Sequence, residues 1–165
     1  MMKQISLAIA LMAACTLTGF AQKFGHINSQ EIVFDLPERS QAESTIEARA
    51  AEYQAEITRM QQEFQTKYVE YQNKMSTWPA AILEQKEREL QGLDQGMQDF
   101  NITTQNELAK LQDELLIPMV QRVQNAINEV GAENGFTYIF DTSVGAVVYT
   151  DGEDVGTLVR AKLGL

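Results

Sequence analysis

Cysteine, histidine and tryptophan are almost missing from this 165-residue chain, which has one of each. A single cysteine cannot form an internal disulfide, and one histidine with one cysteine cannot build a His/Cys metal site. One histidine and one cysteine also cannot build a Cys–His catalytic centre, because such a centre needs a third, orienting group. The sequence therefore predicts a protein that is not an enzyme and that needs no metal and no cofactor.

Positive charge is also scarce, since 13 basic residues stand against 23 acidic ones and the formal net charge is -10. A nucleic-acid-binding protein needs a basic surface, so this balance argues against DNA or RNA binding. It also argues against contact with anionic membranes or lipopolysaccharide. The balance varies along the chain: residues 60–88 carry four basic and four acidic side chains, whereas residues 89–165 carry four basic and twelve acidic ones.

The first 21 residues have the features of a secretory signal peptide. Lys3 supplies a positive start, residues 5–17 form an apolar run too short to span a membrane, and the segment ends in small residues at the positions that signal peptidase reads. We predict cleavage after Ala21, which leaves an exported chain without cysteine.

A lipid anchor is the alternative interpretation of this segment. The residues Met12-Ala13-Ala14-Cys15 loosely resemble a lipobox, in which Cys15 would be lipidated and become the first residue. The protein would then be an outer-membrane lipoprotein rather than a freely diffusing one.

Glycine is missing between His26 and Gln91, which favours continuous helix. Apolar residues recur every seven positions at Ala50, Ile57, Phe64, Tyr71 and Trp78, and after Pro79 a second seam runs from Leu83 to Val130. Two helices with such seams around a short break predict an antiparallel coiled-coil hairpin over residues 38–117. Pro118 is expected to kink the return helix. The seams use Tyr, Met, Phe and Thr beside Leu, and glutamine is frequent around them, which indicates a flexible arm rather than a rigid rod.

The two ends of the chain predict a small sheet. Strands are expected at residues 24–28, 136–140 and 146–149, with Asn134-Gly135 ending the preceding helix and Asp154 capping a final helix through Leu163. So few strands are unstable alone, and this predicts oligomerisation through the sheet. The candidate oligomer core comprises Ile27, Ile139, Phe140, Val147, Val148 and Tyr149.

The predicted fold class is therefore α+β, a long antiparallel helical hairpin on a small β-sheet body. Its parts are the signal peptide (1–21), an N-terminal strand and turn (22–37), the hairpin (38–117) and a C-terminal body with a helix, two strands and a last helix (118–165).

This order of elements resembles the Skp/OmpH family of periplasmic chaperones over the whole mature chain. The motifs that carry the resemblance are the opening stretch from Phe24 to Pro37 and, at the C-terminus, Gly135 to Asp141, Val147-Val148-Tyr149, Asp154-Val155 and Val159. The resemblance implies a periplasmic homotrimer in which three sheets join into a β-barrel and three hairpins surround a cavity. It implies an ATP-independent holdase that keeps unfolded outer-membrane β-barrel proteins in that cavity.

The distal hairpin is the candidate client-binding region, since it is aromatic and has no net charge. We expect clients to contact Phe64, Tyr68, Tyr71, Met75, Trp78, Lys67, Lys74, Lys86 and Arg88. Trp78 has two interpretations, one as a residue that closes the hairpin and one as an exposed client anchor. His26 is interpreted as structural, and residues 151–154 as a turn and helix cap rather than a calcium loop.

A structural protein of the cell envelope is the second hypothesis. Its coiled coil would space or tether components, and lipidation of Cys15 would favour it. It predicts straight, stable helices and no affinity for unfolded chains.

Overall fold

The computed structural model describes residues 22–165; the predicted signal peptide and Cys15 lie outside the described residues. The elements are β1 (Phe24–Ile27), α2 (Ser29–Asp35), α3 (Pro37–Lys74), α4 (Ala80–Glu133), β2 (Tyr138–Asp141), β3 (Glu153–Asp154) and α5 (Gly156–Leu163). The predicted α+β class, with long helices and a small sheet, is confirmed. Within residues 22–165, no helix combines the length and the apolar character that a membrane span requires.

Chain contacts divide the molecule into two compact units, which are described separately below. Of the described residues, the body unit combines 22–32 with Val123–Leu165, and the arm unit is Val33–Arg122. The arm unit contains α3 and most of α4, and the body unit contains the sheet, α5 and the last turns of α4.

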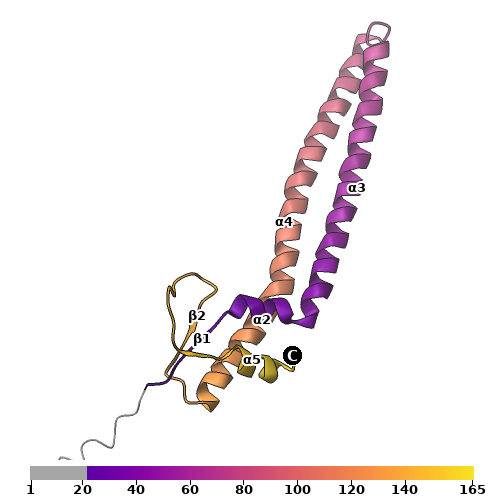
Figure 1. Ribbon diagram of the computed structural model, residues 1–165. Coiled ribbons are helices and arrows are strands. Elements are labelled where there is room, and N and C mark those ends of the chain that lie inside the picture. Colours follow the sequence, from indigo (N-terminus) through magenta and orange to yellow (C-terminus); the bar gives the residue numbers. More distant parts are fainter. Residues whose placement is uncertain (1–21) are drawn as a thin grey trace, which may run out of the picture. The chain divides into compact units, whose positions relative to one another are not determined.

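The arm unit is an antiparallel hairpin, and Figure 1 shows α3 and α4 side by side. Pro37 opens α3 at the first helical position, where a missing N–H costs nothing. The chain turns after Lys74, and α4 begins at Ala80, directly after Pro79. At 1.5 Å per residue, the 38 residues of α3 extend for roughly 57 Å.

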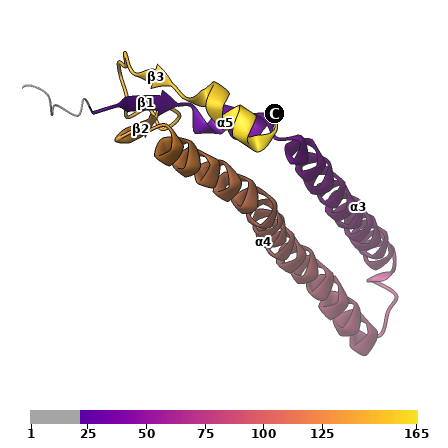
Figure 2. The same cartoon turned by 90° about the horizontal axis from the view of Figure 1, so that it is seen from below.

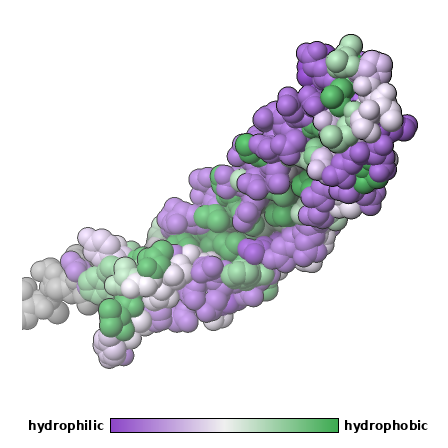
Figure 3. Space-filling view, turned by 90° about the horizontal axis from the view of Figure 1, so that it is seen from above, coloured by the Kyte–Doolittle hydropathy of each residue, from purple (hydrophilic) through white to green (hydrophobic). Residues whose placement is uncertain are grey.

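The seam between the two arm helices is shallow. The heptad residues Ile57, Phe64, Tyr71 and Trp78 are only half-buried. In Figure 3, apolar residues form an interrupted band between polar ones along the hairpin. The buried side chains of the arm unit are Val33, Leu36, Ala42, Thr104 and Met119. Helix α4 continues through Pro118, whose turn lacks one backbone hydrogen bond.

The body unit is built on a three-stranded sheet in the order β2-β1-β3, and both neighbours run parallel to β1 (Figure 2). Along β1, Gly25 and Ile27 face inward and are buried, whereas Phe24 and His26 face outward. Gly25 has to be glycine because an added Cβ would lie 2.9 Å from the Phe136 ring and 3.0 Å from Val155. The buried apolar side chains of the body are Ile27, Ile32, Val123, Ala126, Ile127, Val130, Val155 and Val159.

The predicted strand at residues 146–149 is wrong for the single chain, which has no regular structure there. The third strand is instead Glu153–Asp154, paired with Gly25 and His26 of β1. Acidic residues are poor strand formers, so no local pattern indicates β3. The second strand begins two residues later than expected, at Tyr138 rather than Phe136.

The expected helix ends are found with one change. Gly135 adopts the left-handed conformation (φ 68°) just after α4, as its position predicts. Helix α5 runs to Leu163 as expected, but Val155, not Asp154, is its N-cap residue. The Asp154 carboxylate still accepts a 2.8 Å hydrogen bond from the Gly156 N–H and so satisfies one free donor of α5.

Candidate functional site

The outer face of the body sheet carries three aromatic rings in mutual contact, Phe24, Tyr138 and Phe140. Their centroids lie 6.0 Å apart for Phe24–Tyr138, 6.4 Å for Phe24–Phe140 and 6.1 Å for Tyr138–Phe140. Each ring remains about half exposed. We call these three residues the aromatic face. A continuous apolar surface of this kind in a small body marks an interaction site.

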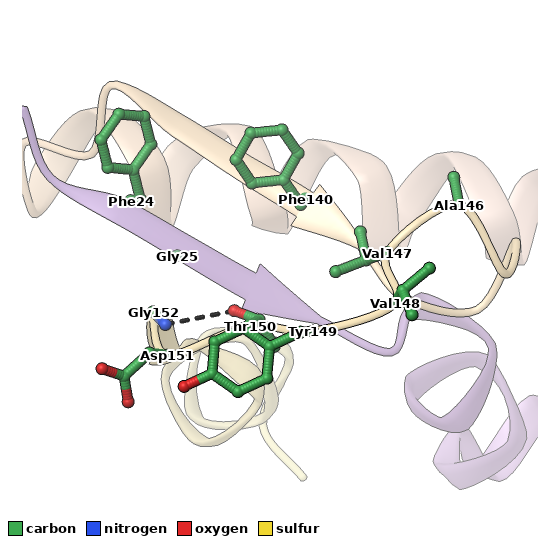
Figure 4. Close-up of a pocket in the computed structure, with 10 residues that line it drawn as sticks. All are labelled: Phe24, Gly25, Phe140, Ala146, Val147, Val148, Tyr149, Thr150, Asp151 and Gly152. Carbon is green, nitrogen blue, oxygen red and sulfur yellow. Dashed lines mark hydrogen bonds between the residues drawn. The ribbon is translucent and has the colours of Figure 1, made fainter.

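The segment Ala146–Asp151 passes beside this sheet with its own backbone unpaired. No backbone–backbone hydrogen bond joins it to any other part of the described chain. Val148 is 98% and Tyr149 82% exposed. With Phe24 and Phe140 the segment borders a hollow of about 690 Å³ (Figure 4). A β-prone segment with free N–H and C=O groups can pair with the strand of another chain.

The structure separates the six residues of the predicted oligomer core into two groups. Ile27 is buried in its own chain, and the Ile139 side chain points at Gly131 of α4, so both stabilise the single body. Phe140, Val147, Val148 and Tyr149 stay at least partly exposed.

Sequence reasoning missed Phe24 and Tyr138 as surface residues. The alternation of side chains along a strand could have found them, since both lie opposite in phase to the inward residues Ile27 and Ile139.

Asp141, at the end of β2, fixes the start of α2. Its carboxylate accepts hydrogen bonds from the Ser29 N–H (3.2 Å), from the Ser29 hydroxyl and from the Ser143 N–H (2.9 Å). Burial opposes ionisation of Asp141, but these hydrogen bonds from Ser29 and Ser143 outweigh it and lower the pKa of the carboxyl. Asn28 and Glu31 complete the helix start as a reciprocal capping pair.

We expect an Asp141→Ala variant to lose about 2 kcal/mol of unfolding free energy, because several hydrogen bonds to a charged group disappear. A lowered pKa in the folded state means that the carboxylate stabilises the body above about pH 4 and that this contribution is lost as the pH falls further. Urea unfolding at pH 7 and pH 3 checks both statements. Asp141→Asn is the matched control, which keeps the shape and should flatten the acid dependence; an unchanged acid dependence would contradict the assignment.

On the arm, the predicted aromatic residues lie together. The rings of Phe64 and Tyr68 stack with centroids 6.0 Å apart, and Tyr68 and Met75 are 39% and 48% exposed. Trp78 is half-buried against Tyr71, with centroids 6.3 Å apart. This contact fits the hairpin-closing interpretation of Trp78.

The four predicted client-binding cations are engaged within the arm. Lys74 pairs with Glu70 at 2.9 Å, Arg88 with Glu84 at 2.5 Å and Lys86 with Glu89 at 3.2 Å. Lys67 reaches across the hairpin to the same Glu89, whose pKa these two lysines lower.

Further polar contacts join the helices of the arm unit. The Tyr71 hydroxyl donates to Glu87 at 2.8 Å and the Tyr53 hydroxyl to Glu107, and these bonds raise the pKa of both phenols. The Tyr53 ring also meets Phe100 edge-on at 6.1 Å, and Arg122 pairs with Glu38. Specific polar contacts thus set the hairpin register where apolar burial is shallow.

His26 lies outward on β1, with Nδ1 3.4 Å from the Thr150 hydroxyl. Across residues 22–165, no cluster of three or more His, Cys, Asp or Glu side chains could hold a metal ion. The acidic residues 151–154 form a loop and the short strand β3.

Comparison with known proteins gives one family and one fold. The profile of the outer membrane protein (OmpH-like) family matches residues 23–163. No curated protein sequence matches the chain. Among solved structures, an OmpH-like protein from Caulobacter crescentus CB15, described provisionally as an outer membrane chaperone, matches with a TM-score of 0.73 and 17% identity over 86% of this chain and 83% of that one.

Proposed function

Since the chain belongs to the OmpH-like family, we propose that it is a periplasmic chaperone that holds unfolded outer-membrane β-barrel proteins without ATP. The mechanism is sequestration, in which many weak contacts with helical arms keep the client soluble until a folding machine takes it. The structurally related protein from Caulobacter crescentus, described provisionally as an outer membrane chaperone, supports the chaperone part of this proposal.

The observation that carries the proposal is that the body unit exposes apolar and backbone groups that have no partner within one chain. A three-stranded sheet with an exposed aromatic face and an unpaired segment at residues 146–151 has no partners of its own for these groups. Copies of the chain supply them if each segment 146–151 adds to the sheet of a neighbour, which buries Val148 and Tyr149. In this proposed arrangement the sheets form a barrel, and the resemblance to the family implies three copies.

The arms supply the client-binding surface in this proposal. Their helices are longer than a small core requires, and their half-buried seams leave Tyr68, Met75 and other apolar side chains at the surface. Unfolded barrel strands present alternating apolar residues, which such a surface can meet in many registers.

An aggregation assay tests this function. An outer-membrane barrel protein unfolded in urea is diluted into buffer with or without the mature protein and without nucleotide, and light scattering is followed. We expect scattering to be suppressed at one assembly per client. Bovine serum albumin at equal mass is the control. Client aggregation at the control rate would contradict the proposal and favour a structural coiled-coil protein.

A further inference from the structure

We propose that client binding uses one longitudinal side of the distal part of α3, where an apolar stripe and a glutamine stripe lie next to each other. The apolar stripe consists of Phe64, Tyr68 and Met75, and the glutamine stripe of Gln61, Gln65 and Gln72. The occupant is an extended segment of an unfolded chain with alternating apolar side chains. This inference rests on the proposed chaperone function and specifies how the arm recognises its client.

Helical spacing places these stripes. Positions 64, 68 and 75 recur at intervals of four and seven residues, which keeps them on one side of a helix. Positions 61, 65 and 72 repeat the same intervals about 60° further around the axis, with Tyr68 close to both sets. Phe64 and Tyr68 form a stacked pair, and Tyr68 and Met75 are partly exposed, so the apolar stripe is accessible to a partner.

The glutamines have free hydrogen-bonding groups. Gln61, Gln65 and Gln72 are exposed, and their side chains have no hydrogen-bond partner among residues 22–165. A primary amide both donates and accepts, so it can pair with the backbone of an extended peptide regardless of sequence. Apolar side chains of a client would pack on the apolar stripe, while the backbone of the client forms hydrogen bonds with the glutamine side chains.

The charged side chains on the other side of the apolar stripe are already paired with each other or with α4. A third, charged stripe is offset by one residue from the apolar one and consists of Glu63, Lys67, Glu70 and Lys74. Its lysines are paired, Lys74 with Glu70 and Lys67 with Glu89. Residues 60–88 have no net charge, and all four of their cations are paired. An anionic lipid or nucleic acid would need free cations, whereas an apolar extended chain does not. The charge distribution therefore favours the unfolded chain as occupant.

Fluorescence anisotropy of a labelled, urea-unfolded barrel protein tests this inference on the mature protein. We expect Tyr68→Ser with Met75→Ser to weaken binding about tenfold, since two partly exposed apolar side chains lose their contact with the client. Gln61→Ala, Gln65→Ala and Gln72→Ala together should weaken it roughly threefold. The matched control, Glu56→Gln with Arg59→Gln, removes an exposed ion pair of α3 that belongs to neither stripe, without changing net charge, and should shift the Kd less than about twofold. Circular dichroism is used to check that each variant keeps its helices.

The outcomes separate the two proposals. An unaltered protein that does not bind the unfolded client overturns the chaperone function and this inference with it. Binding that survives the Tyr68 and Met75 changes, or that weakens more in the Glu56 and Arg59 control, leaves the chaperone function standing and contradicts the two stripes as the binding surface. A Kd that rises steeply between 50 and 500 mM NaCl also overturns it, because contacts made by apolar and amide groups are not screened by salt.

Discussion

A Val148→Asp variant is expected to run as single chains, whereas the unaltered protein is expected to run as an assembly. Val148 is 98% exposed in the single chain, so the new carboxylate costs nothing in the fold of one copy. In the proposed assembly the same position is covered by a neighbour, and each copy would bury an unpaired charge at a cost of several kcal/mol. Light scattering coupled to size-exclusion chromatography measures the change, and circular dichroism verifies the fold.

Val144→Asp is the matched control for this prediction. Val144 is also well exposed, at 72%, but it lies in the turn that follows β2 and does not border the hollow beside the aromatic face. We expect this variant to keep the mass of the assembly. Equal masses for both variants would show that the segment 146–151 is not where copies meet.

Shortening the arm is expected to abolish client protection while the body still assembles. Residues 55–105 are replaced by a four-residue Gly/Ser loop, which can bridge the 8–10 Å that separates two packed helices. The cut lies just beyond the hydrogen bond between Tyr53 and Glu107, which holds the two helices together at this level. Removal of both stripes should leave scattering of a diluted barrel protein at the level without chaperone.

This variant separates the roles of the two units. The mass of the shortened protein should correspond to the same number of copies as the full chain, because the body unit is unchanged. Full protection by the shortened protein would place client binding in the body and contradict the arm as the binding surface.

The helical hairpin could be predicted from the sequence because its apolar residues recur at a regular spacing. Seven-residue spacing of Ala50, Ile57 and Phe64, together with Pro79 between the two seams, predicts the hairpin that is observed. Gly135 likewise marked the end of α4. In these places one local signal and the tertiary structure agree, which is where sequence reasoning is most reliable.

Contacts between residues far apart in the chain could not be predicted from the sequence. Asp141 and Ser29 are 112 positions apart, and nothing near either residue indicates their contact. The contact of Lys67 with Glu89 depends on the register of the two arm helices, which no pattern near either residue indicates. By contrast, Glu63–Lys67, Glu70–Lys74 and Glu84–Arg88 have the four-residue spacing of helical ion pairs. Three of the four predicted client-binding cations could therefore have been recognised as paired from sequence.

The segment 146–149 illustrates a third case. Its β-prone residues predict a strand, yet a single chain offers it no partner, and it stays irregular and unpaired. If copies pair through this segment as proposed, the sequence pattern describes the assembly rather than one chain.

The most direct test of the account is the absolute mass of the mature protein in solution, measured by light scattering alone and after mixing with a urea-unfolded barrel protein. We predict the mass of three chains for the protein alone and the mass of three chains plus one client after mixing, with the client kept soluble. A particle whose mass does not change while the client aggregates would contradict the account, whatever its number of copies.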